Sequence, residues 1–240
     1  MPRFYIDTPL AAGQLVDLPP EVAHHIHVVR LAPGDPVTLF NGTGGQYEAA
    51  LTEVGKKRAT AHVTAFDPRE AELPHAVTLA QGLPEGTKMD WIIEKAVELG
   101  AGAIVPLAAR RCVVRLSAER AEKKLAHWRG VAVAAAEQSG RNRLTHVADP
   151  VDLRDWLATP AAGARLLLSP RATQSLADWA RAAGPQSVTV MVGPEGGFTD
   201  DEEAAAIAAG AVAVSMGPRI LRTETAGLAL LAALGAVWPS

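Results

Sequence analysis

Short apolar runs alternate with longer amphipathic segments over the C-terminal two-thirds of the sequence. Each run has four to six mostly small or branched aliphatic residues, a pattern that is typical of a buried strand and too short for a helix. Since helical segments fall between the runs, the pattern predicts an α/β domain with a mostly parallel sheet. The expected strands are 76–80, 103–107, 165–168, 188–192 and 211–216.

Polar residues and glycines mark where the intervening helices begin and end. Residues 87–90 and 199–202 have the spacing of a capping box, in which a threonine and an acid three residues later bond backbone N–H groups. Gly100 and Gly210 stand where a C-terminal glycine belongs. Residues 149–152, Asp-Pro-Val-Asp, predict a helix start ahead of Leu153.

The N-terminal part of the chain has a different pattern, with short β-type runs separated by turn signals such as Asn41-Gly42. Only 20–29 is long enough for a helix, so a small β-barrel or sandwich is expected. A linker with two prolines and several acids at 67–74 then divides the chain into domains 1–70 and 75–240. The expected strands of the first domain are 3–6, 36–40, 47–54 and 58–66.

Composition narrows the class of protein. The 240 residues are 48% apolar, and the single cysteine, Cys112, excludes an internal disulfide and is expected to be a buried small hydrophobe. Neither a signal peptide nor an apolar stretch of about 20 residues is evident, so we expect a cytoplasmic protein. His24, His25 and His27 cluster without further ligands, so no metal site is expected.

Charge is unevenly distributed along the chain. The net charge is −3, but the segment 110–143 has nine basic residues against three glutamates. Such an excess could form a patch for RNA phosphates, provided that it gathers on one face. A solvated helix with internal ion pairs explains the same count, and the sequence leaves both interpretations open. The nine are Arg110, Arg111, Arg115, Arg120, Lys123, Lys124, Arg129, Arg141 and Arg143.

Two loops rich in glycine and proline carry the strongest sign of function. Residues 193–198 (Gly-Pro-Glu-Gly-Gly-Phe) and 217–226 (Gly-Pro-Arg-Ile-Leu-Arg-Thr-Glu-Thr-Ala) each follow a predicted strand and lead into a helix. Two such loops would share one crevice at the carboxyl edge of a parallel sheet, where open α/β folds bind ligands. Glu195, Arg222 and Glu224 add charges that a simple turn does not need.

Glu195 limits what the loops can bind. The sequence has no Walker-type, dinucleotide-type or Gly-x-Ser-x-Gly motif, and a carboxylate in a glycine-rich loop repels a pyrophosphate. Backbone groups exposed by glycine can bond an adenine edge, while a carboxylate can accept from ribose hydroxyls or oppose a positive centre. S-adenosylmethionine, a sulfonium without phosphate, meets these conditions. The alternative is that Glu195 only caps its own loop.

Further segments extend the pattern over nearly the whole chain. They are Arg3-Phe4, His24-His25, 29–31 with Gly34-Asp35, 94–100 and 136–139 with Arg141. With the two glycine loops, they make the sequence resemble the RsmE family of SPOUT-class methyltransferases, which form 3-methyluridine in small-subunit (16S) ribosomal RNA. Val97 and Thr145 depart from the threonine and proline that are usual in the family, but neither lies in a cofactor loop.

The resemblance implies a PUA-like β-domain, followed by a SPOUT domain with a trefoil knot that binds S-adenosylmethionine. It also implies a symmetric homodimer, for which the apolar segment 226–237 is a candidate surface. Three loops, 168–170, 193–197 and 216–221, would line the cofactor pocket. The cofactor-binding residues expected are Leu168, Gly193, Glu195, Gly196, Gly197, Met216, Gly217, Ile220, Leu221 and Ala226.

The chemistry of uridine N3 methylation suggests roles for the charged residues. N3 must lose its proton and lie in line with the donor's methyl group, on a base that is unpaired or extruded. Arg222 is expected to stabilise charge on the uracil carbonyls, and Glu195 or Glu224 to accept the proton; an ion pair between Arg222 and Glu224 is the alternative. The RNA-binding residues expected are Arg3, His24, Arg30, Arg110, Arg111, Arg141 and Arg143.

Two other functions stay open on the sequence. One is methylation of another RNA, because target choice lies outside the cofactor loops. The other is a non-catalytic RNA-binding protein of ribosome assembly, against which the intact charged residues of both loops count.

Overall fold

The computed structural model describes residues 1–114 and 118–238. Two compact units are present: Met1–Glu72 with Ala136–Leu144, and Leu73–Ala135 with the residues from Thr145 onward. The domain limits at 70 and 75 stay a prediction, to which the structure adds the association of Ala136–Leu144 with the first unit. No helix in the described part of the chain is long and apolar enough to cross a membrane.

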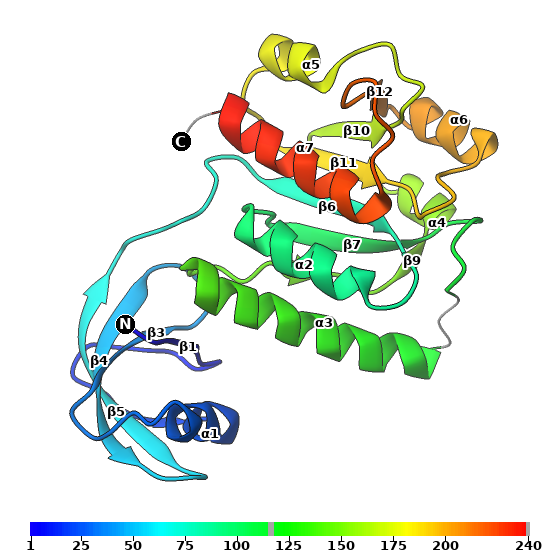
Figure 1. Ribbon diagram of the computed structural model, residues 1–240. Coiled ribbons are helices and arrows are strands. Elements are labelled where there is room, and N and C mark those ends of the chain that lie inside the picture. Colours follow the sequence, from blue (N-terminus) through cyan, green and yellow to red (C-terminus); the bar gives the residue numbers. More distant parts are fainter. Residues whose placement is uncertain (115–117, 239–240) are drawn as a thin grey trace. The chain divides into compact units, whose positions relative to one another are not determined.

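The first unit is built on one five-stranded sheet with the order β1-β3-β4-β5-β2 (Figure 1). β1 pairs with β3 in parallel and the other pairs are antiparallel. Helix α1 packs on β4 and β5, so the unit is a single covered sheet and not two packed sheets. The four expected strands are confirmed, while β2, only four residues long, was missed. The elements are β1 Arg3–Tyr5, β2 Leu15–Leu18, α1 Pro20–Val28, β3 Pro36–Phe40, β4 Gln46–Val54 and β5 Ala59–Asp67.

The second unit has the predicted parallel sheet, and all of its strand pairs are parallel. Its order is β12-β10-β11-β6-β7-β8, with β9 beside β7. The central strands are buried on both faces, which explains why they are almost wholly apolar in sequence. The strands are β6 Val77–Gly82, β7 Ala103–Ala108, β8 His146–Val147, β9 Val151–Asp152, β10 Ala164–Leu168, β11 Val188–Val192 and β12 Val212–Val214.

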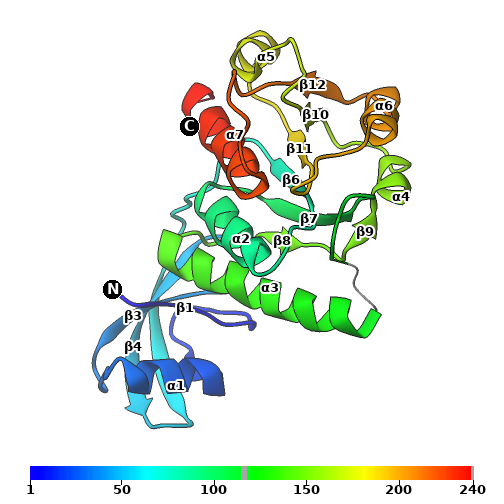
Figure 2. The ribbon, with the colours of Figure 1, turned by 45° about the vertical axis from the view of Figure 1, so that its right-hand side comes forward.

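Helices cover both faces of this sheet. Helix α7 contacts α2, α5, β6 and β11 on one face, whereas α4 and α6 contact each other on the opposite face, as Figures 1 and 2 show. The architecture is therefore a layered α/β fold, as expected; the knot stays a prediction. The helices are α2 Lys88–Glu98, α3 Ala118–Ser139, α4 Leu153–Leu157, α5 Leu176–Ala183, α6 Asp200–Ala208 and α7 Thr223–Val237.

Several helix ends agree with the sequence. Thr199 and Glu202 form the complete capping box predicted for α6. Gly100 and Gly210 follow the last turns of α2 and α6 with φ of +88° and +87°. These ends could be predicted because each depends on local backbone geometry alone.

Helices α2 and α4 begin where the sequence predicted, after Thr87 and at Leu153, but the expected capping contacts are wrong. Thr87 precedes α2 but makes no capping hydrogen bond. Asp90, its expected partner, instead accepts from Trp128 Nε1 at 3.1 Å, because α3 packs beside α2. Asp152 and not Asp149 caps α4, since Val151–Asp152 is drawn into the sheet beside β7.

Gly227 lets α7 approach the sheet closely. A Cβ at this position would lie 2.9 Å from Leu79 Cδ1 and 3.3 Å from Val192 Cγ2, and both side chains are buried. Gly235, two turns later in the same helix, has nothing nearer to such a Cβ than 3.9 Å. The N-terminal half of α7 can therefore pack closely on β6 and β11 because Gly227 has no side chain.

We expect Gly227→Ala to lower the free energy of unfolding by about 1–3 kcal/mol, because the added methyl group overpacks a full core. Gly235→Ala, the matched control, should raise it by up to about 1 kcal/mol, since alanine favours a helix. Urea denaturation measures both. A stabilising Gly227→Ala would contradict the close packing of α7.

Candidate cofactor cavity and active site

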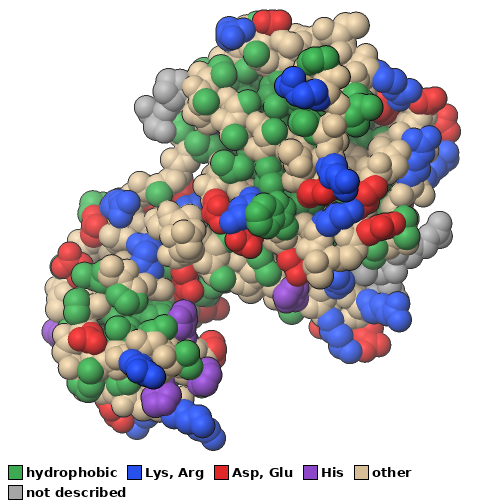
Figure 3. Space-filling model, in the orientation of Figure 1, with side chains coloured by type: hydrophobic (Ala, Val, Ile, Leu, Met, Phe, Trp, Pro, Cys, Tyr) green, Lys and Arg blue, Asp and Glu red, His purple; other side chains and the backbone are tan. Residues whose placement is uncertain are grey.

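The loops that follow β10, β11 and β12 meet in one cavity of about 480 Å³, a volume within the range of small-molecule sites. They meet because β10 lies between β12 and β11 with all three strands parallel, so that their carboxyl ends share one edge. All ten residues expected to bind the cofactor line this cavity, and so do Arg222, Glu195 and Glu224. Acidic and basic side chains gather over the N-terminal end of α7 (Figure 3).

The loop after β11 turns back on itself within five residues. The N–H of Gly197 donates to the carbonyl of Pro194 at 2.8 Å, and Gly197 has a φ of +66°. A Cβ on Gly193 would lie 2.9 Å from Phe198 N, so only glycine fits there. The glycines therefore serve the tight turn, which brings backbone groups to the cavity wall.

Thr223, the first residue of α7, bonds two segments that are distant in sequence. Its hydroxyl donates to the carbonyl of Gly193 at 2.6 Å and accepts from Gln81 Nε2 at 2.8 Å. Gln81 is fully buried at the end of β6. These two bonds fix the start of α7 against the loop after β11.

Glu195 is held by the segment between β6 and α2. Its Oε1 accepts from Lys88 Nζ and from the backbone N–H of Glu85 at 3.0 Å. Burial alone would raise the pKa of Glu195, but the hydrogen bonds from Lys88 and Glu85 outweigh it and leave the pKa below its ordinary value. Glu195 is thus an ionised carboxylate bound to a neighbouring loop, which disfavours the alternative that it only caps its own.

Arg222 and Glu224 flank Thr223 at the start of α7. Arg222 is exposed and is the residue before the first helical turn. The structure describes both residues and has no ion pair between Arg222 and Glu224, the alternative considered from the sequence. Glu224 Oε2 is buried and has no hydrogen-bond partner in the described part of the chain. Neither side chain is therefore committed to the other, and both residues line the cavity.

Sequence reasoning missed two charged residues that line the cavity, and an arginine that bonds one of them. Lys88 and Glu203 line it, and Arg171 bonds Asp200 at 2.7 Å and Glu203 at 2.9 Å, which joins the loop after β10 to the start of α6. Lys88 is the first residue of α2, the helix that follows β6, and β6 is the strand next to β11. The order of strands in the sheet was the missing information, since nothing in the local sequence around Lys88 points to the cavity.

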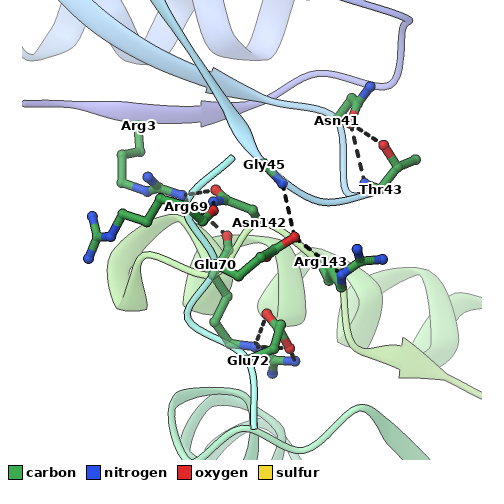
Figure 4. Close-up of polar contacts among 10 residues, drawn as sticks. Arg3, Asn41, Thr43, Gly45, Arg69, Glu70, Glu72, Asn142 and Arg143 are labelled. Carbon is green, nitrogen blue, oxygen red and sulfur yellow. Dashed lines mark hydrogen bonds and ion pairs between the residues drawn. The ribbon is translucent and has the colours of Figure 1, made fainter. Parts of the chain in front are cut away.

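Two of the expected RNA contacts, Arg141 and Arg3, bond other residues of the first unit; Figure 4 labels Arg3 and its partner Asn142. Arg141 is 2% exposed and forms a bidentate ion pair with Glu72, so it cannot reach a phosphate. Arg3 donates to Asn142 Oδ1 at 2.7 Å, and burial lowers its pKa. Both arginines instead connect 141–142 to the rest of the first unit.

The other expected RNA contacts in the first unit have exposed side chains, but not all of them are free of ion pairs. Arg143 is exposed but pairs with Glu70 at 3.3 Å, as Figure 4 shows. Histidines gather over α1 (Figure 3), where His24 is exposed, and Arg30 just beyond α1 is exposed as well. Arg30 adopts a φ of +62°. In the first unit, His24, Arg30 and Arg143 therefore keep an exposed side chain.

In the second unit, Arg110 pairs with Asp201 at 3.0 Å. Arg111 donates to the carbonyls of Gly196 at 2.8 Å and Phe198 at 3.3 Å. Arg111 therefore braces the loop after β11, a role that the sequence did not suggest. Arg115 lies outside the described residues.

Ion pairs also reduce the excess of charge in the segment 110–143. Besides Arg110, Arg141 and Arg143, Lys123 bonds Glu119 on α3 at 2.7 Å. The pair Lys123–Glu119 is internal to the helix, as the alternative interpretation had it, whereas the three arginines pair with acids outside the segment, at Asp201, Glu72 and Glu70. Burial raises the pKa of Cys112, which is consistent with the small buried hydrophobe expected there.

Comparison with known proteins agrees with this architecture. Residues 71–235 match the family model of the RNA methyltransferase domain, and residues 18–64 match that of the RNA methyltransferase PUA domain. Ribosomal RNA small subunit methyltransferase E of Bacillus subtilis is 32% identical over 98% of this chain and 96% of its own. The protein of that name from Mycobacterium tuberculosis is 37% identical, over 97% and 90%.

Solved structures are similar over the full length. Ribosomal RNA small subunit methyltransferase E from Neisseria gonorrhoeae, bound to S-adenosyl methionine, is 41% identical with a TM-score of 0.92, covering 99% of this chain and 98% of that one. A Legionella pneumophila protein in complex with the cofactor SAM is 34% identical with a TM-score of 0.93, covering 98% and 97%.

We expect Arg141→Ala to lower the free energy of unfolding by about 3–5 kcal/mol, because it leaves the carboxylate of Glu72 without its buried partner. Arg143→Ala, the matched control, removes an exposed pair and should cost less than about 1 kcal/mol. Urea denaturation followed by circular dichroism compares them. Equal effects of the two changes would show that the buried pair does not stabilise the first unit.

Proposed function

Since the chain belongs to the family of ribosomal RNA small subunit methyltransferase E, we propose that it methylates N3 of a uridine in 16S ribosomal RNA with S-adenosylmethionine as the donor. One observation carries the proposal. A single cavity is lined by glycine backbone, an ionised Glu195, the exposed side chain of Arg222, and Glu224, whose Oε2 has no hydrogen-bond partner in the described part of the chain. These groups suit a cationic donor without phosphate and a base that must lose a proton.

The backbone of the three loops supports donor binding. The loops present N–H and C=O groups of 168–170, 193–198 and 216–221 around the cavity, and these can bond an adenine without side chains. Glu195 adds a negative charge that can oppose a sulfonium or accept from ribose hydroxyls. The residues present therefore fit S-adenosylmethionine, which supplies an electrophilic methyl group when bound.

We assign the proton of uridine N3 to Glu224 in preference to Glu195. Two donors already occupy Oε1 of Glu195, and its pKa below the ordinary value makes it a weak base. Glu224 Oε2 is buried without a donor among the residues described, so it can accept a proton directly. In the same step, Arg222 stabilises the negative charge that develops on the uracil carbonyls.

The dimer and the RNA surface belong to the same proposal. From Thr225 to Val237, α7 has no charged residue, and Ala232 and Ala236 on it are exposed. This face suits a symmetric contact with a second copy of the chain. For the RNA we retain His24, Arg30, Arg110 and Arg143, whose side chains are exposed, and no longer include Arg3, Arg111 and Arg141.

The activity is tested with purified protein, S-adenosylmethionine and small ribosomal subunits or 16S RNA, with nucleosides identified by mass spectrometry. We expect 3-methyluridine in 16S RNA and none in large-subunit RNA or tRNA. Methylation of large-subunit RNA or tRNA instead would support the alternative that the enzyme acts on another RNA. Donor binding without methylation of any RNA would support a non-catalytic assembly protein.

The roles within the site are tested by kcat. Glu224→Gln should lower kcat by about 10²–10⁴-fold through loss of the proton acceptor, and Arg222→Ala by about 10²–10³-fold through loss of charge stabilisation. Both should leave donor affinity nearly unchanged. Glu119→Gln, an exposed change on α3, is the control. A large loss of kcat in Glu195→Gln with normal turnover in Glu224→Gln would reverse the assignment.

A further inference from the structure

Lys88 has no part in the proposed reaction, yet it lines the cavity from the first turn of α2. Its Nζ bonds Oε1 of Glu195, the same oxygen that accepts from the backbone of Glu85. The backbone N–H of Glu195 also acts on its own carboxylate, and no side chain within 1–114 or 118–238 donates to Oε2. One oxygen of the carboxylate is therefore anchored and the other is left for a ligand.

The pair is only partly open to solvent, with side-chain exposures of 32% for Lys88 and 31% for Glu195. The hydrogen bond to Glu195 raises the pKa of Lys88, and the charge of Glu224 acts in the same direction. Lys88 thus remains charged, and Glu195 neutralises that charge. A lysine at this place would repel a cationic ligand if it were not paired.

We propose that Lys88 is a positioning residue that makes the cavity selective for a positively charged sulfonium over a neutral thioether. By holding Oε1, it fixes the carboxylate of Glu195 as a negative charge opposite the donor. The inference rests on the proposed function, because methyl transfer converts the sulfonium into the thioether of S-adenosylhomocysteine. The product loses the charge that Glu195 attracts, so the same pair favours its release.

Among the contacts that keep Glu195 ionised, the hydrogen bond from Lys88 has the largest effect on its pKa. Burial acts to raise the pKa of Glu195, and Lys88 makes the first of the contacts that lower it. Without the lysine, we expect the pKa of Glu195 to rise, so that the carboxylate takes up a proton more readily as the pH falls. The groups near Glu195 are Lys88 on α2, Glu85 before it, Glu224 on α7, and Arg111 and Cys112 after β7.

The test is calorimetric titration of S-adenosylmethionine and S-adenosylhomocysteine into four proteins. These are the wild type, Lys88→Met, Lys88→Arg and the control Lys95→Met, which removes a lysine paired with Glu94 and Glu98 on the same helix. At pH 7, Lys88→Met should weaken binding of the sulfonium about tenfold and of the thioether less than about threefold. Lys88→Arg and Lys95→Met should keep the wild-type ratio.

A pH series separates positioning from a general loss of structure. From pH 7 to pH 5, wild-type affinity for the sulfonium should stay constant, because the lowered pKa keeps Glu195 ionised. In Lys88→Met it should fall as Glu195 becomes protonated. Glu195→Gln should lose the selectivity at every pH, because glutamine has no charge to lose, and the double variant should lose no more than Glu195→Gln alone.

Equal weakening for both ligands, or none for either, would overturn the inference and leave the donor assignment intact. A flat pH series in Lys88→Met would also overturn it. Failure of the wild type to bind S-adenosylmethionine would instead refute the proposed function, and the role of Lys88 with it.

Discussion

The hydroxyl of Thr223 is the point on which the cavity depends. It joins Gln81 at the end of β6, Gly193 after β11 and the first turn of α7 through two short hydrogen bonds. Since Arg222 and Glu224 are its neighbours in sequence, these bonds also place both charged side chains at the cavity. The close packing of α7 at Gly227 continues the same attachment along β6 and β11.

The loop after β11 is braced from two sides by residues that are remote in sequence. Lys88 and Glu85 bond the side chain of Glu195, while Arg111 bonds the carbonyls of Gly196 and Phe198. A loop with three glycines would otherwise be conformationally permissive. Residues that follow β6 and β7 therefore restrict the conformation of this glycine-rich loop. A loop held in one conformation favours binding and methyl transfer, because the reacting groups must be aligned.

Much of this arrangement could be predicted from the sequence. The five apolar runs became strands of one parallel sheet, and the loops 193–198 and 217–226 line one cavity, because strand direction alone brings them to one edge. Lys88 could not be found in this way, since its role depends on the position of β6 beside β11.

The errors have the same origin. Arg141 looks like a phosphate contact in sequence, but its partner Glu72 lies 69 residues earlier in the chain. Thr87 and Asp90 have the spacing of a capping box, but Asp90 instead accepts a hydrogen bond from Trp128 on α3. Local patterns thus predicted elements and loops, and failed where a charged side chain pairs across the fold.

The central claim is that three loops at one edge of the sheet form the donor site, and a crystal structure of the protein with S-adenosylmethionine tests it most directly. We expect the donor among 168–170, 193–198 and 216–226, with its sulfonium beside Glu195. A donor bound elsewhere, such as in the separate cavity between Leu83, Arg110 and Leu153, would contradict the account.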